Sequence, residues 1–210
     1  PVNQWSHVAA TFDGSMVRLF LNGVERSSEA ATLASPSNGA PVIIGGTCFD
    51  AGARFPGLLD EVTIVNSALT ARELAAITNA GNAGICSFGK DCAAVPPGML
   101  ASWRGEGNAF DRKKFHNGTL MNGTAFDSGI AGKSFSFDGT NDYVSVPAFD
   151  MGNDWTVEGW INSPGHKENL LGPHYTEIGV GVVQAPDKNP KYIAVQVFGR
   201  PQSAKFTFQI

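Results

Sequence analysis

The sequence is poor in charged residues and in cysteine, and it has no long apolar segment. Charged residues make up 16% of the 210 residues and the formal net charge is −4, which leaves no electrostatic basis for binding nucleic acid. No apolar run approaches about 18 residues, so no membrane-spanning helix is expected. The chain begins at Pro1 without a Met or a signal-like apolar segment, and we expect it to be a piece of a longer protein.

Cysteine occurs three times. Cys86 and Cys92 bracket a short segment, and two cysteines at this spacing do not form a zinc site without other ligands. The pair is either a small disulfide loop, as in an oxidising compartment, or two free thiols in a linker. Cys48 has no assigned role.

Glycine and proline are abundant. The 25 Gly and 12 Pro, together with 42% hydrophobic residues, favour a turn-rich β protein with enough apolar side chains for a core. Closely spaced strands are predicted in the first part of the chain at residues 5–14, 16–25, 40–46 and 55–69. Asn22-Gly23 predicts a tight hairpin after the second strand. This spacing of strands is typical of a sandwich or jelly roll.

One clear helix is predicted after these strands. Thr70 is its predicted N-cap, and Glu73, three residues on, completes a capping box. Leu74 and Ile77 fall on one face, and Gly81 is predicted to close the helix in the left-handed conformation.

Residues 81–97 lack periodicity and end in Pro-Pro, which predicts a linker. Further strands are predicted at residues 98–111, 118–130, 133–147 and 154–161, the last of them alternating like a half-buried strand. The pattern changes after this strand. Ser163 as N-cap, Pro164 at the first helical position and Gly172 at the end predict a short helix, and two strands follow at residues 176–185 and 191–201.

The strings "WSHVAATFDGSMVRLFLNGVE" and "FPGLLDEVTIVNSALTARELAAI" resemble the C-terminal half of a bacterial laminin G-like, concanavalin A-like jelly roll. They define a first segment at residues 1–80. Residues 98–161, with "KSFSFDGTNDYVSVP" and "WTVEGWI", resemble the N-terminal half of the same family. We therefore predict a mainly β, antiparallel sandwich in which residues 98–161 pair with residues 3–78 in permuted order, because this buries apolar faces that neither half buries alone.

Residues 162–210 resemble a different family. "WINSPGHKENLLGPHYTEIGVGVV" is similar to the C-terminal part of bacterial CAP-superfamily domains, which include cysteine-rich secretory and pathogenesis-related 1 proteins. The resemblance implies a short α/β piece and places His166 in a cavity of two His and two Glu that can bind a divalent metal. The other cavity residues would lie in a part of the domain that this chain lacks. His166 is then a residue without a ligand at a helix start, and zinc is not expected to bind.

The laminin G-like resemblance also implies a structural calcium ion, which takes oxygen ligands. Asp60 is the first candidate ligand, followed by Asp111 and Asp138; the alternative is that all three are ordinary carboxylates of turns and strand ends. The four tryptophans either include a platform for stacking on sugars or lie in the core, and alternation favours the core for most of them.

The sequence shows no catalytic constellation. Ser6 and His7, for example, are neighbours in a strand, so their side chains point to opposite faces. We expect a non-catalytic adhesion module that binds carbohydrate or protein, in a secreted or surface protein of bacteria. The alternatives are a fragment of a CAP-type extracellular protein with an incomplete metal or catalytic cavity, and a chimeric fragment with no function of its own.

Overall fold

The larger of two facing β-sheets contains strands from residues 1–80 and from residues 98–161. The computed structural model describes residues 4–31, 41–46, 54–86, 91–163, 179–180 and 197–198. In order of pairing, the strands of this sheet are β10 (Ala125–Ser128), β11 (Lys133–Asp138), β5 (Pro56–Val65), β13 (Trp155–Asn162), β1 (Ser6–Phe12), β2 (Met16–Leu21) and β3 (Val24–Ala30), and β8 (Met99–Trp103) also pairs with β5.

Strand β13 lies between β1 and β5 and runs antiparallel to both. Its Trp155 is opposite Phe12 of β1 and its Thr156 is opposite Val65 of β5. Strands β8 and β11 pair with β5 as well. Residues 98–161 therefore complete the sheet of residues 1–80, and the predicted permuted pairing is confirmed.

The smaller sheet covers one face of the larger sheet. It consists of β4 (Val42–Ile44), β12 (Tyr143–Val146) and β9 (Thr119–Met121), and here too a strand of the second segment pairs with one of the first. The main core lies between the two sheets. Its buried side chains are Ala10, Phe12, Leu19, Ile44, Ile64, Ala101, Trp103, Ala109, Phe135, Phe137, Val144, Val146, Met151 and Trp155. The chain is thus a mainly β antiparallel sandwich, as predicted.

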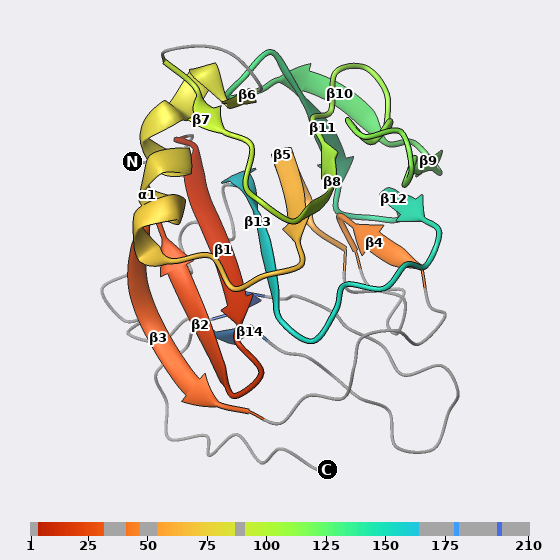
Figure 1. Ribbon diagram of the computed structural model, residues 1–210. Coiled ribbons are helices and arrows are strands. Elements are labelled where there is room, and N and C mark those ends of the chain that lie inside the picture. Colours follow the sequence, from red (N-terminus) through yellow and green to blue (C-terminus); the bar gives the residue numbers. More distant parts are fainter. Residues whose placement is uncertain are drawn as a thin grey trace, which may run out of the picture.

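The helix α1 (Ala71–Ala80) packs on the opposite face of the large sheet (Figure 1). The predicted capping box is present, because the Thr70 side chain accepts from the Glu73 amide and the Glu73 carboxylate accepts from the Thr70 amide. Leu74 and Ile77 are buried in a second cluster together with Ala9, Phe20, Val65, Leu69, Ile85 and Ala93. The large sheet is therefore apolar on both faces.

Two local predictions need correction, one on the burial of β13 and one on the conformation of Gly81. Strand β13 is buried on both faces and not half-buried, because Thr156 hydrogen-bonds to Ser67 and Leu69, and Glu158 pairs with His7. Gly81 has φ 49° and ψ −121°, so it has the expected positive φ without the left-handed helical conformation. Of the four tryptophans, Trp103, Trp155 and Trp160 lie in the interior, as alternation favoured.

The predicted linker is ordered where the structure describes it. Residues 81–83 form a short 3₁₀ helix, η1 (Gly81–Ala83), and β6 (Ile85–Cys86) pairs in parallel with β7 (Ala93–Ala94). A disulfide joins Cys86 to Cys92. Of the two alternatives for these cysteines, the structure has the disulfide loop.

The described part of the CAP-like piece is small. β14 (Gly179–Val180) pairs antiparallel with β15 (Val197–Phe198), and each falls within one of the two predicted strands. The helix predicted from Ser163 onward lies outside the described residues. Among the helices that the structure describes, none has the length and apolar character needed to cross a membrane.

The packing between the sheets predicts the effect of shortening a core ring. Phe135 on β11 is fully buried, whereas Phe115 is 78% exposed. Phe135→Ala is expected to lower the free energy of unfolding by about 3–5 kcal/mol, because it leaves a cavity between the sheets. Urea unfolding checks this. Phe115→Ala is the matched control, with an expected change within about 0.5 kcal/mol; equal losses in the two variants would contradict the core assignment.

Candidate functional site

A buried His–Glu pair lies on the helix-covered face of the large sheet. His7 Nε2 of β1 is 2.8 Å from Glu158 Oε2 of β13, and neither side chain is exposed. The Trp160 ring lies edge-on to the His7 ring at 5.3 Å between centroids. Asn22 Oδ1, in the hairpin turn, accepts from the His7 backbone amide at 2.8 Å. The pair is locked between neighbouring strands and cannot be reached by a substrate.

The signal for this pair in the sequence is polarity within otherwise apolar strands. Glu158 stands in "WTVEGWI" and His7 in "WSHVAATF", where each replaces an apolar residue on a buried face. The two residues are separated by 151 positions, so no local pattern connects them.

A bulge in β5 turns two consecutive carboxylates into the interior. Between Glu158 and Trp160 the register of β13 shifts against β5, so that Gly159 faces more than one residue of its partner. Glu61 has φ 51°, a left-handed conformation that favours glycine. A strand without a bulge would send Asp60 and Glu61 to opposite faces; here Asp60 is 0% exposed and Glu61 is 2% exposed.

The Asp60 carboxylate binds backbone amides. Its Oδ1 accepts from the Glu61 amide at 2.7 Å and its Oδ2 from the Ala131 amide at 3.1 Å. Burial, together with the nearby Glu61 carboxylate and against the effect of the backbone donors, raises the pKa of Asp60 to about 7. Asp60 therefore ties β5 to the turn before β11, and near neutral pH it carries a proton in part of the molecules.

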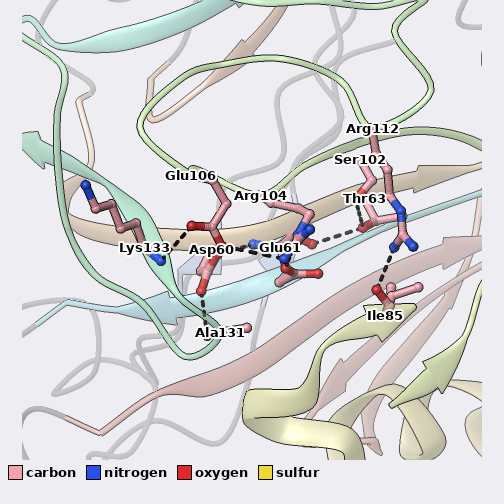
Figure 2. A network of polar contacts seen from close by, with 10 residues as sticks. All are labelled: Asp60, Glu61, Thr63, Ile85, Ser102, Arg104, Glu106, Arg112, Ala131 and Lys133. Atoms are coloured by element: carbon pink, nitrogen blue, oxygen red, sulfur yellow. Dashed lines mark hydrogen bonds and ion pairs between the residues drawn. The ribbon is translucent and has the colours of Figure 1, made fainter. Parts of the chain in front are cut away.

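Glu61 pairs with an arginine of the loop after β8. Its Oε1 accepts from Arg104 Nε at 3.0 Å, and Arg104 also reaches Glu106 at 3.6 Å, as Figure 2 shows. Glu61 Oε2 is buried and has no hydrogen-bond partner among the described residues. Burial raises the pKa of Glu61 even though Arg104 lowers it.

The linker closes over Glu61. A Cβ placed on Gly84 would lie 3.3 Å from Glu61 Oε2, so only a glycine backbone fits comfortably here. Arg112 Nη1 donates to the Ile85 carbonyl at 2.5 Å (Figure 2). This hydrogen bond joins β6 to the loop between β8 and β9. The Cys86–Cys92 disulfide closes the short loop that leads from β6 to β7.

Asp111 organises the loop of residues 104–118, between β8 and β9, which we call the Asp111 loop. Its Oδ1 accepts from the amides of Ser102 and Lys113 at 2.9 and 3.1 Å. Its Oδ2 accepts from the amides of Phe115 and His116, both at 3.1 Å. One buried carboxylate thus fixes the backbone of the loop from within.

Two phenylalanine rings project from this loop into solvent. Phe110 is 65% exposed and Phe115 is 78% exposed. By contrast, the ring of His116 stacks on Phe149 with centroids 4.0 Å apart, and Trp103 Nε1 donates to the His116 carbonyl. The loop is therefore anchored at Asp111 and His116 while it presents two large apolar side chains outward.

The three predicted calcium ligands do not lie together. Asp60 and Asp111 are buried and accept backbone amides. Asp138 is the exposed last residue of β11, and its Oδ1 accepts from the Thr140 amide at 2.7 Å. Within the described ranges, no group of three or more His, Cys, Asp or Glu is placed to hold a metal ion. Calcium binding at these residues stays a prediction. His166 lies outside the described residues.

Two family models match parts of the chain. Residues 1–75 match a laminin G family described as the concanavalin A-like lectin/glucanases superfamily, and residues 132–198 match CAP, described as the cysteine-rich secretory protein family. The two matches confirm the composition predicted from the motifs. No curated protein and no solved structure matches the chain.

The CAP match starts earlier in the chain than the motifs indicated. It begins at residue 132, whereas the CAP-like piece was predicted from residue 162. The residues between these points include β11, β12 and β13, all of which pair with strands of the first segment. This part of the match therefore lies inside the sandwich.

The burial of Asp60 predicts a pH dependence of stability. The folded chain holds the Asp60 proton up to about pH 7, whereas the ordinary pKa is 3.8. Its contribution to the free energy of unfolding is therefore complete below the ordinary pKa and is lost as the pH rises through about 7. Urea unfolding is measured from about pH 4 to about pH 7. Over this range, the free energy of unfolding should fall less in Asp60→Asn than in the unchanged chain. Asp138→Asn should keep the full dependence; the same dependence in Asp60→Asn would contradict the assignment.

The contacts of Asp111 predict a large cost for its removal. Asp111→Ala is expected to lower the free energy of unfolding by about 3 kcal/mol or more, because it leaves several amide donors without an acceptor at a buried position. Asp138→Ala is the control and should cost about 1 kcal/mol or less, since that residue is exposed and accepts a single amide. Urea unfolding of both variants measures these losses. Equal losses of unfolding free energy in Asp111→Ala and Asp138→Ala would show that Asp111 does not organise its loop.

Proposed function

We propose that the chain is a non-catalytic adhesion module that binds a carbohydrate or protein surface, as part of a secreted or surface protein of bacteria. Laminin G-like and CAP domains are typically extracellular, and both match this chain. The Cys86–Cys92 disulfide supports an oxidising compartment. A binding role for a sandwich of this kind is an analogy from the fold, so specific support has to come from residues on the surface.

The observation that carries the proposal is the pair of exposed rings on the Asp111 loop. Large aromatic side chains dominate the energetics of binding surfaces, and elsewhere in a protein they are usually buried. Phe110 and Phe115 are both mostly exposed. Because Asp111 fixes the backbone that carries them, little conformational entropy is lost when a ligand binds.

The buried acids and the histidine support a structural role and not catalysis. A general acid or base has to reach its substrate, and the His7–Glu158 pair has no exposed side-chain surface. Asp60 and Glu61 are closed off by Ala131, Arg104 and the backbone of Gly84. These groups hold strands and loops of the sandwich in position.

The Phe110→Ala/Phe115→Ala double variant tests the proposal. On an array of immobilised neutral and acidic polysaccharides and extracellular proteins, the unchanged chain should bind at least one class of ligand. The double variant should weaken that binding by about a hundredfold, as expected for two anchors worth about 1.4 kcal/mol each.

Val24→Ala is the matched control, because Val24 is 53% exposed on β3 and lies outside the Asp111 loop. It should bind as the unchanged chain does. Undiminished binding by the phenylalanine double variant, or an equal loss with Val24→Ala, would refute the proposed binding surface.

A further inference from the structure

We infer that the Cys86–Cys92 disulfide controls the order of the Asp111 loop, so that reduction of this disulfide by an external dithiol loosens the loop. The disulfide lies in the linker, and two basic side chains of the loop hold on to that linker. The consequence for binding rests on the proposed function, because the exposed phenylalanines lie on this loop. The coupling itself is a property of the folded chain and requires no ligand.

The disulfide restrains a strand pair that is weak by itself. β6 and β7 run parallel, and each has only two residues. Parallel neighbours usually require a connection of about a dozen residues or more, whereas Cys86 and Cys92 are separated by 6 positions in the sequence. A strand pair this short gains little stability from its own hydrogen bonds. The covalent bond between the two cysteines therefore keeps β7 beside β6.

Two side chains of the Asp111 loop are attached to the linker. Arg112 Nη1 donates to the carbonyl of Ile85, the residue directly before Cys86, at 2.5 Å (Figure 2). Lys113 Nζ donates to the Met99 carbonyl, just after the linker, at 2.8 Å. Hydrogen bonds from charged donors are stronger than those between neutral groups. The loop is thus held to the chain before β7 and again after it.

The contact between linker and loop depends on these hydrogen bonds because side chains do not fill the space between them. A hollow of about 380 Å³ lies there, and its lining includes both basic residues. Continuous packing would keep the two segments together even when one attachment is released. Across a hollow, a shift of β6 withdraws the acceptor of Arg112 without other contacts to replace it. The lining residues are Val95, Pro96, Gly98, Met99, Arg112 and Lys113.

The Asp111 loop has a backbone conformation that its surroundings must maintain. Lys114 has φ 66°, in the left-handed region that residues other than glycine rarely adopt. The residue before it, Lys113, donates its amide to Asp111 Oδ1 at 3.1 Å, and Phe115 after it donates to Asp111 Oδ2 at 3.1 Å. Arg112 lies between Asp111 and this turn. Release of Arg112 therefore removes an outer attachment from a strained turn.

Reduction proceeds by thiol–disulfide exchange. Cys86 and Cys92 are half-buried, so a small dithiol can reach one of the sulfurs. A thiolate of the dithiol attacks that sulfur, the bond between the two cysteines breaks, and the other cysteine leaves and takes up a proton. The second thiol of the dithiol then displaces the attached cysteine. The protein gains two electrons and two protons, and the dithiol becomes a disulfide.

The main core lies apart from this linker. Of the described residues that form the main core, none belongs to residues 81–97. Ile85 and Ala93 are buried in the second cluster, against α1. Reduction is therefore expected to act on the linker and the Asp111 loop while the two sheets stay packed on each other.

Hydrogen exchange of backbone amides, followed by NMR, tests the coupling in the unchanged chain before and after reduction with dithiothreitol. The amides of Lys113, Phe115 and His116 should exchange about tenfold faster or more in the reduced chain, a ratio usual for coupling between sites. The amides of β12, which is paired on both sides, should change by less than about twofold. Reoxidation should restore slow exchange in the loop.

Arg112→Gln tests the route of the coupling. In this variant the loop amides should already exchange fast in the oxidised chain, and reduction should add less than about twofold. Arg18→Gln is the matched control, because Arg18 lies on β2 and pairs with Asp13; it should keep the full response. Cys86→Ser/Cys92→Ser should reproduce the reduced chain without the reagent, and thermal unfolding of each sample establishes that exchange is measured on folded protein.

Four outcomes would overturn the inference. The disulfide could resist dithiothreitol in the folded chain, or the loop amides could exchange equally in the oxidised and reduced chains. An equal acceleration in β12 would make the disulfide a general staple of the fold. A full response in Arg112→Gln would show that Arg112 does not connect the loop to the linker. If the chain binds nothing on the ligand array, the proposed function fails while the exchange measurements still decide the coupling.

Discussion

The architecture depends on the pairing of β13 with β1 and β5. Both partners belong to the first laminin G-like segment, and neither pairs with the other directly. Without β13, each would present a free edge at the centre of the sheet, where exposed backbone groups invite other strands to pair. The main core also depends on this pairing, because Trp155 of β13 and Phe12 of β1 pack near each other within it. Residues 1–80 and 98–161 thus contribute to one sheet and one core, although the laminin G family model matches only residues 1–75.

The helix-covered face of the large sheet is where polar groups enter the interior. The β5 bulge brings in Asp60 and Glu61, and β1 and β13 contribute His7 and Glu158. Buried polar groups of this kind are costly unless they are paired, and pairing makes them specific for one arrangement. Here they join β5 to the turn before β11 and to the loop after β8. The face that stabilises the linker therefore also positions the start of the Asp111 loop.

Local patterns in the sequence predicted much of the fold. Alternation located the strands, Thr70 and Glu73 located the helix start, and the order of the two resemblances predicted the permuted pairing. The bulge could not be predicted, because its left-handed residue is Glu61 and not a glycine. The His7–Glu158 pair and the four amides gathered by Asp111 depend on folding, which no local pattern encodes. Asp60 and Asp111 were predicted as calcium ligands, which stays a prediction; in the structure their carboxylates accept backbone amides.

The position of β13 in the chain also determines when the protein can fold. During synthesis β1 and β5 emerge first. The strand that must lie between them arrives only after the linker, the Asp111 loop and the five strands β8 to β12. Folding therefore cannot be completed domain by domain from the N-terminus, as it is in many multidomain proteins. Contacts between such distant segments slow folding further, because long loops must close first. The large sheet therefore cannot be completed until β13 has been synthesised.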